Sequence, residues 1–372
     1  MPLPKEITIA ASSRARYGLG RFLLLGTVLI SVAACGGAAA TPVPPAATLA
    51  PTVTPTAAPT RAPTAAVATP TTAAVATPTT APSLGLVRPA GAGTVVAWGD
   101  DSAGQTEVPA GLTGVVAVSA GDDFSMALKS DGTIVAWGGS DDPAETKTPA
   151  AATGIKAIAA GSNFGIALKS DGTVVGWGDN TAGQSRPPAS LKSAVGIAAA
   201  GSHAIALKSD GTVVAWGDDS NGATDVPSGL KSVAEVSAGY DFSLALLTDG
   251  TVVAWGDKFP TDVASGVAKV PAGLAGVKAV SAGFVHNLVL KSDGTVLSWG
   301  SNSDGETKVP AGLKALAVAA GGNFSLALKA DGTVVGWGGN GSGQATPPSG
   351  LVNVTAIDAG GSHALAIVAQ GS

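Results

Sequence analysis

Cysteine, histidine, methionine and tyrosine are scarce in this sequence of 372 residues, which has one Cys, three His, two Met and two Tyr. A single cysteine, Cys35, cannot form a disulfide within the chain. From residue 92 onward there is no cysteine and no glycine-rich phosphate-binding loop. Acid and base chemistry in this region would have to use paired carboxylates, as in some glycan-cleaving enzymes, and the sequence marks out no such pair.

Basic residues are also few. Residues from 92 onward carry 15 Lys and Arg against 25 Asp and Glu, a net charge of −10. This balance disfavours nucleic acid and anionic membrane surfaces as partners, and it favours a basic protein or a cation.

No apolar run is long enough to span a bilayer, which takes about 20 residues. The longest, Phe22–Ala34, follows a basic segment and suits the apolar core of a signal peptide. The junction Val32-Ala33-Ala34-Cys35 resembles a bacterial lipobox, in which the cysteine is acylated and becomes the mature N-terminus. This resemblance implies a signal peptide at 1–34 and a lipid on Cys35. The alternative is an ordinary secretory signal cut near Ala34, and both place the mature protein outside the cytoplasm.

Residues 35–91 follow the signal and are almost wholly Ala, Thr and Pro, with the duplication AAVATPTT at 65–72 and 73–80. Such a composition lacks the apolar surface to pack, and it predicts a disordered, extended stalk with threonines that could accept sugars.

The remainder, 92–372, is a repeat array with a period close to 40 residues. Its seven tryptophans lie at 98, 137, 177, 216, 255, 299 and 337. An Ala-Gly pair recurs in step and ends at Gly121, Gly161, Gly201, Gly239, Gly283, Gly321 and Gly360. Seven copies of each marker indicate seven repeats.

Each repeat predicts short β-strands. In the first full repeat these are 114–120, 124–130 and 133–137, β-branched or alternating in side-chain size and bounded by Gly and Asp. The Asp-Gly turn at Ser130–Thr133 suits a tight hairpin. The pattern allows a fourth, outer strand at Gln105–Val108, ended by Pro109.

Small antiparallel sheets that are apolar on both faces and repeat every 40 residues are typical of β-propeller blades. The array begins with a third strand, Thr94–Trp98, and ends with first and second strands, Val354–Ala359 and His363–Val368. We therefore predict an all-β, seven-bladed propeller in which these N- and C-terminal strands pair in one shared blade.

The residues that follow the tryptophans resemble a known repeat. Trp-Gly-x-Asn-x-x-Gly-Gln occurs at Trp177–Gln184 and Trp337–Gln344, and Trp98–Gln105 departs from it only at Asp101. This pattern is similar to that of the regulator of chromosome condensation family, which implies a seven-bladed propeller. The short blades look most like a secreted bacterial group that includes an inhibitor of β-lactamases.

The strand order places the Ala-Gly loops and the loops after Trp-Gly on one face, the loop face, where the repeats differ from one another. Exposed aromatic residues outside framework positions are Tyr240, Phe259 and Phe284, and we expect them to form an interface cluster. The polar residues expected to bind on this face are Asp100, Asp122, Asp123, Asn163, Asp219, Asp241 and Asn323. The structural alternative is that Phe259 packs its own long loop and that the Asp residues cap turns.

The three histidines, His203, His286 and His363, occupy a slot that holds Phe in the other repeats, so we interpret them as framework residues. We predict no catalytic site, no metal and no cofactor, and no loop has the spacing of an EF-hand calcium site. The favoured function is a monomeric, membrane-anchored lipoprotein whose extracytoplasmic propeller binds a protein through the loop face, and the net charge favours a basic partner. Alternatives are inhibition of a β-lactamase or related cell-wall enzyme, and glycan binding or cleavage at the cell surface.

Overall fold

The computed structural model describes residues 92–139, 144–258 and 266–369, and the structural statements below concern these residues. The predicted signal peptide and stalk, with Cys35, lie outside them, and so does Phe259. None of the described residues belongs to a helix that could cross a membrane.

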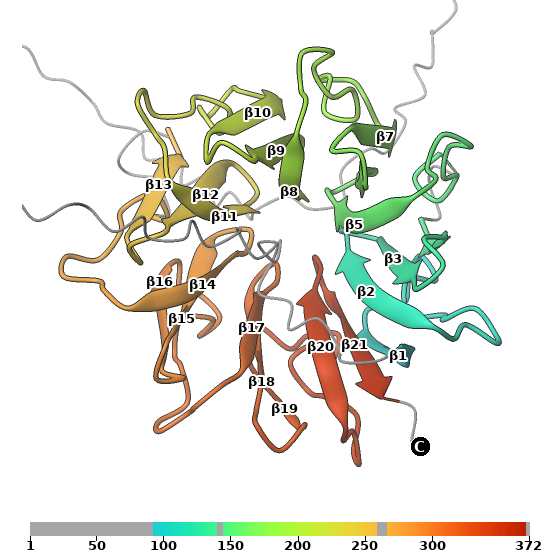
Figure 1. Ribbon diagram of the computed structural model, residues 1–372. Helices are drawn as coiled ribbons and strands as arrows, with labels where there is room; N and C mark the ends of the chain where they lie inside the picture. The colour runs from blue at the N-terminus through green and yellow to red at the C-terminus, as the bar shows by residue number, and fades with distance from the viewer. Residues whose placement is uncertain (1–91, 140–143, 259–265, 370–372) are drawn as a thin grey trace, which may run out of the picture. The chain divides into compact units, whose positions relative to one another are not determined.

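All regular elements in the described ranges are β-strands, which form three-stranded antiparallel blades (Figure 1). One pairing, Gly93 opposite Val115, links two of these blades into a six-stranded sheet. The first strand of each blade leads into an Ala-Gly loop. These first strands are β2 (Val115–Ala120), β5 (Ile155–Ala160), β8 (Ala194–Ala200), β11 (Val233–Ala238), β14 (Val277–Ala282), β17 (Ala317–Ala320) and β20 (Val354–Ala359).

The second strand of each blade starts with Phe or His and pairs with both of its neighbours. These second strands are β3 (Phe124–Lys129), β6 (Phe164–Lys169), β9 (His203–Lys208), β12 (Phe242–Leu247), β15 (His286–Lys291), β18 (Phe324–Leu328) and β21 (His363–Ala369). Their side chains are almost entirely buried because another blade packs on each face.

The third strand of each blade ends in Trp-Gly. These third strands are β1 (Gly93–Gly99), β4 (Ile134–Gly138), β7 (Val174–Gly178), β10 (Val213–Gly217), β13 (Val252–Gly256), β16 (Val296–Gly300) and β19 (Val334–Gly338). We number the blades by first strand, so that blade 1 is β2–β4, blade 6 is β17–β19, and blade 7 is β20, β21 and β1.

Blade 7 combines both ends of the folded region. β1 pairs antiparallel with β21 from Gly93 opposite Ala369 to Gly99 opposite His363. The first strands contact one another in chain order, and β20 contacts both β17 and β2. Figure 1 shows β20 and β21 beside β1 and β2, so the chain returns to its start. The fold is a seven-bladed β-propeller.

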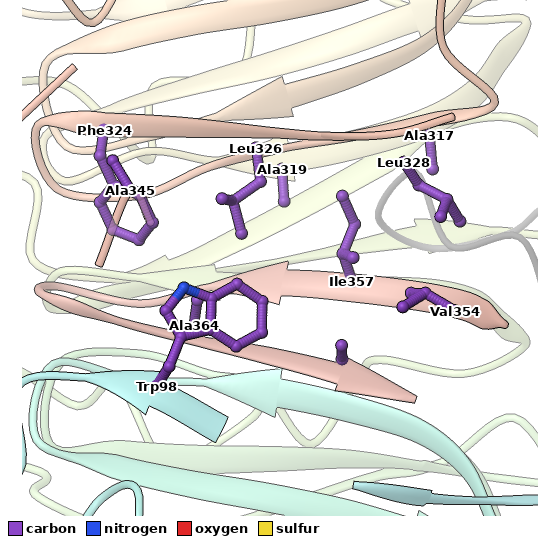
Figure 2. Packing of buried hydrophobic residues seen from close by; sticks show 11 residues of the cluster. Trp98, Ala317, Ala319, Phe324, Leu326, Leu328, Ala345, Val354, Ile357 and Ala364 are labelled. Atoms are coloured by element: carbon purple, nitrogen blue, oxygen red, sulfur yellow. The ribbon is translucent and has the colours of Figure 1, made fainter. Parts of the chain in front are cut away.

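The hydrophobic core is divided among the interfaces between blades. In the interface of Figure 2, Phe324 and Leu326 of blade 6 face Ile357 and Ala364 of blade 7, and Trp98 of β1 completes the cluster. On the opposite face of blade 7, Leu365 and Ile367 pack with residues of blade 1. Blade 7 is therefore packed on both sides, as the others are.

Each tryptophan fixes the segment that precedes its blade. The seven indole Nε1 groups donate to backbone carbonyls at 2.7–2.9 Å, six of them 31 or 32 residues earlier in the chain. The seventh, Trp98, reaches the Gln344 carbonyl at 2.9 Å, which reproduces the same geometry across the two ends of the chain.

The fourth strand allowed by the sequence at Gln105–Val108 does not form. The Gln105 carbonyl instead accepts hydrogen bonds from the Ser125 hydroxyl at 2.8 Å and the Trp137 indole at 2.9 Å. Because side chains use this carbonyl, it is not available for a backbone ladder, and the described blades have three strands.

Candidate functional site

The Ala-Gly loops meet at the propeller axis and are joined by backbone hydrogen bonds from blade to blade. Ser162 N donates to Gly201 O at 3.0 Å, Gly322 N to Gly360 O at 3.0 Å and Gly361 N to Gly121 O at 3.1 Å. Glycine is needed here because a Cβ on Gly121 would lie 2.7 Å from Gly161 O. With Asp122 N donating to Ser162 O at 3.3 Å and Phe284 N to Gly321 O at 3.2 Å, these contacts join the loops of blades 5, 6, 7, 1, 2 and 3 into a platform.

A second set of contacts joins the first strands just below these loops. The side chain that precedes Ala-Gly accepts a hydrogen bond from the backbone N–H of the next blade. Ser119, Ser237 and Ser281 accept in this way from Ala160, Ala282 and Ala320 at 3.0 Å. In blade 7 the acceptor is a carboxylate, because Asp358 Oδ2 accepts from Ala120 N at 2.9 Å.

The axis contains a pocket, which we call the axial pocket. It is a small cavity of about 50 Å³ that opens to solvent. Its walls are mainly Ala, Gly and Ser of the first strands and Ala-Gly loops, and its larger lining residues are Asp122, Phe284 and Asp358.

Both carboxylates in this pocket are held away from water. Burial raises the pKa of Asp358 from 3.8 to about 7, and the hydrogen bond from Ala120 N only partly opposes this. Burial also raises the pKa of Asp122 to about 7; the nearby Ser162 hydroxyl lowers it, and the charges of Asp123 and Glu145 raise it further. Both residues keep some exposure because they face the pocket, although protein atoms surround their carboxylates.

An aromatic pair lies at this pocket. The rings of Tyr240 and Phe284 have centroids 5.0 Å apart and are tilted by 50°. Tyr240 is 42% exposed, and Asp122 is close enough for its charge to raise the tyrosine pKa in addition to the effect of burial. A Cβ atom on Gly361 would lie 3.5 Å from Phe284 Cζ and 3.3 Å from Asp122 Cα, so the Phe284 ring extends toward Asp122. The structure thus brings together three of the residues expected to bind: Tyr240, Phe284 and Asp122.

The other residues predicted for the site hold turns around this centre. Asp100 accepts from Ser102 and Gln105, and Asp219 accepts from Thr224 N. Asn163 donates to Glu145, and Asn323 donates to Asp304. The Asp100 and Asp219 contacts match the turn-capping alternative, whereas the Asn163 and Asn323 side chains bind loops that lie 18 and 19 residues earlier in the chain.

Asp123 and Asp241 each accept a hydrogen bond through the backbone carbonyl, from Gly139 N at 2.8 Å and from Asp257 N at 3.0 Å. Burial raises the pKa of Asp241, and its hydrogen bond with Asn221 opposes that effect.

Asp358 is a pocket residue that the sequence reasoning missed. A signal was available, because the residue two places before the glycine of each Ala-Gly loop is Ser or Ala in the other six repeats and a charged residue only in "DAG". In the sequence, Asp358 is one substitution within a predicted strand, and only the fold shows that this position lies at the axis.

The histidines lie in the interfaces between blades and not in the axial pocket. Each Nε2 lies 2.9–3.0 Å from a serine hydroxyl of the next blade, in the pairs His203 with Ser243, His286 with Ser325 and His363 with Ser125. Burial lowers the pKa of each imidazole to about 4, which keeps it neutral. Within the described ranges, no group of three or more His, Cys, Asp or Glu could hold a metal ion.

Comparison with known families identifies the repeat. Six segments match the family model described as the Regulator of chromosome condensation (RCC1) repeat: 115–142, 155–184, 194–223, 233–257, 277–306 and 316–344. These six segments of the folded region are similar to RCC1 repeats. The shared blade, which joins the two ends of the array, lies outside these six matches. No curated protein matches the sequence.

Solved structures with a similar fold come from RCC1-type propellers and other proteins. Prp20p from Saccharomyces cerevisiae, whose binding to Gsp1p and histones its structure report describes, is 18% identical with a TM-score of 0.65; the match covers 77% of this chain and 94% of that one. Human WBSCR16 is 15% identical with a TM-score of 0.58, covering 75% and 99%. The ectodomain of the receptor kinase CR4 from Physcomitrella patens is 24% identical with a TM-score of 0.53, covering 68% and 69%. At these identities the likeness concerns the fold alone.

Proposed function

We propose that this RCC1-repeat propeller is a protein-binding module that holds its partner against the loop face at the axis. The observation that carries the proposal is the Tyr240–Phe284 pair, which is exposed beside a pocket on a platform of hydrogen-bonded loops. Exposed aromatic residues on a rigid surface are typical anchors of protein interfaces. The similar fold of Prp20p, which binds Gsp1p and histones, agrees with this use of a propeller.

The proposal places the propeller outside the cytoplasm, on a lipid attached to Cys35 and at the end of the stalk of residues 35–91. The support is the lipobox-like junction at Val32–Cys35 and the Ala, Thr and Pro composition that follows it. Inhibition of a β-lactamase or another cell-wall enzyme is one form that such binding could take, and it stays a prediction from sequence resemblance.

Carboxylate-based catalysis fits the axial pocket less well than binding does. Glycosidases use two carboxyl groups whose pKa values differ, so that one donates a proton while the other is ionised. Burial raises the pKa values of Asp122 and Asp358 to the same value, about 7, which does not separate an acid from a base. We therefore propose that the protein is not an enzyme.

The test is capture of secreted and surface proteins by the mature chain, followed by affinity measurement with whatever protein is captured. Tyr240→Ala and Phe284→Ala should each weaken binding by about 2 kcal/mol or more. Leu297→Ala is a matched control, because Leu297 is 41% exposed and Tyr240 is 42% exposed, yet Leu297 lies in β16 away from the Ala-Gly loops. Equal losses from the three variants would contradict the proposed surface, and capture of a polysaccharide in place of a protein would favour the glycan-binding alternative.

A further inference from the structure

The axial pocket contains carboxylates without a basic side chain to pair with them. Its lining residues include Asp122 and Asp358 and no Lys, Arg or His. Beside Asp122 lies the Ser162 hydroxyl, 7% exposed and without a well-formed hydrogen bond to any described residue. Burying carboxylates without a positive charge is costly, so these groups favour a cationic ligand over a neutral or anionic one.

The aromatic pair adds a second, independent preference for a cation. The Phe284 ring lines the pocket and packs against Tyr240, whose ring is near enough to Asp122 to feel its charge. The faces of aromatic rings attract cations, most strongly where water is excluded. Asp122 and Phe284 each directly follow the glycine of an Ala-Gly loop, so an organic cation entering along the axis would meet a carboxylate and an aromatic ring together, with Asp358 on the adjoining strand.

The walls decide the shape of the ligand. They are built from Ala and Gly of successive first strands and Ala-Gly loops, including Ala160, Ala200 and Gly283. Such walls leave a narrow cavity, which admits a thin alkyl chain with a compact ammonium more readily than a planar, forked guanidinium. Lysine, with a compact charge on a four-carbon stem, matches this shape better than arginine does.

We propose that the axial pocket binds the ammonium group of a lysine side chain, which the protein partner inserts along the propeller axis. This inference rests on the proposed function and names the part of the partner that enters the pocket. The charge of the folded region agrees with it, because residues from 92 onward carry a net charge of −10, which attracts a basic surface.

The experiment needs no identified partner. Nuclear magnetic resonance of the full chain, labelled in its backbone amides, would be titrated with Nα-acetyl-lysine methylamide. The neutral isostere Nα-acetyl-norleucine methylamide is the matched ligand control. We expect the lysine analogue alone to shift resonances of the Ala-Gly loops, and Asp122→Ser or Asp358→Ser to weaken its binding by about tenfold or more.

Serine is the appropriate replacement because the chain already uses it at equivalent positions. Ser162 occupies the slot of Asp122 in blade 2, and Ser119 occupies the slot of Asp358 in blade 1, where its hydroxyl makes the same contact to the next blade. Both variants should therefore fold, which an unchanged amide spectrum away from the axis would verify. Leu297→Ala should bind the lysine analogue as the parent chain does.

Binding should also strengthen from about pH 5.5 to about pH 8 as the carboxylates lose their protons. The groups that face Asp122 are Asp123, Glu145, Ser162, Tyr240 and His363, and those that face Asp358 are Ser119 and the backbone of Ala120 and Ala359. None of these groups carries a positive charge between about pH 5.5 and about pH 8, because burial lowers the pKa of His363 to about 4.

Equal binding of the norleucine and lysine analogues, unchanged binding in both serine variants, or no binding of the lysine analogue would each overturn the inference. Butylammonium tests whether the ammonium group has to belong to a peptide. If it binds as strongly as the lysine analogue, the pocket is assigned to free amines and a peptide lysine is contradicted. Failure of the proposed function has a different result, namely a captured partner whose affinity does not depend on Tyr240 or Phe284.

Discussion

The imidazole Nε2 of His363 lies 2.9 Å from the hydroxyl of Ser125, and this contact joins blade 7 to blade 1. Because Ser125 gives its own hydrogen to the Gln105 carbonyl, at 2.8 Å, the imidazole must donate to the serine oxygen. Three blades have His as the first residue of the second strand, and each is followed by a blade that has serine at the position of Ser125. The other four blades have Phe there, and the blades that follow them have Gly165, Ala204, Asn287 and Ala364 at the position of Ser125.

This pairing predicts a strong coupling between the two positions. His363→Phe alone should lower the free energy of unfolding by about 1–3 kcal/mol, because it leaves the buried Ser125 hydroxyl with one partner fewer and forces a larger ring into the site. Ser125→Ala added to His363→Phe reproduces the Phe–Ala combination of Phe324 and Ala364 and should recover most of the loss. Chemical denaturation of both single variants and the double variant measures the coupling. Additive losses would show that the two side chains do not act as a pair.

Removal of β1 should destabilise the whole propeller. A chain that begins at residue 100 loses the ladder between β1 and β21 and the buried Trp98, whose loss alone typically costs about 3–5 kcal/mol. A chain that begins at residue 92 keeps β1 and is the control. Thermal unfolding and size-exclusion chromatography should show a lower melting temperature and self-association through the exposed edge of β21. A monomer with an unchanged melting temperature would contradict a structural role for the shared blade.

Asp358 should make the stability depend on pH. Its pKa is 3.8 in the unfolded chain and about 7 in the folded one, so the folded state holds a proton that the unfolded state releases. The stability that this proton provides is present below about pH 4 and is lost as the pH rises through about 7, at up to about 1.4 kcal/mol per pH unit.

Asp358→Ser removes this effect. The free energy of unfolding of the variant should therefore increase relative to that of the parent chain as the pH rises from about 4 to about 7. The buried histidines change stability in the opposite sense, because burial lowers the pKa of each, but their contribution cancels in the difference between the two chains. Parallel pH profiles for the two chains would mean that the Asp358 pKa is not raised.

Cys35→Ser tests the predicted lipid anchor. The unsubstituted protein should partition with membranes into detergent, and the variant should be released or incorrectly processed, since serine cannot carry the thioether-linked lipid. Cell fractionation and mass spectrometry of the N-terminus provide the measurement. Membrane association that persists in the variant would rule out acylation at this cysteine.

The purified propeller should not turn over peptidoglycan fragments, polysaccharides or β-lactams. Product release would be followed by chromatography, with Asp122→Ser and Asp358→Ser as the controls for a carboxylate mechanism. Turnover that disappears in either variant would establish an enzyme and replace the binding proposal.

The candidate site divides into a part that the sequence revealed and a part that it did not. Tyr240 and Phe284 follow Ala-Gly pairs, so the repeat alignment alone predicted that they lie on one face. Phe259 lies outside the described residues, so its place in the predicted cluster is untested. Asp358 was missed because its position lies inside a strand, where the sequence period marks it as framework and the neighbouring repeats have small residues.

The number of blades, the order of their strands and the two halves of the shared blade could be predicted from the sequence alone. These features follow from the spacing of Trp, Ala-Gly and Asp-Gly, which are local signals with a local physical cause. Which side chains converge at the axis depends on how the blades pack around it. Asp122, Phe284 and Asp358 are up to 236 residues apart in the chain, yet they line one pocket because successive blades bring the same point of each repeat to the centre. The raised pKa values of Asp122 and Asp358 arise from desolvation by residues of several blades, which no single repeat encodes.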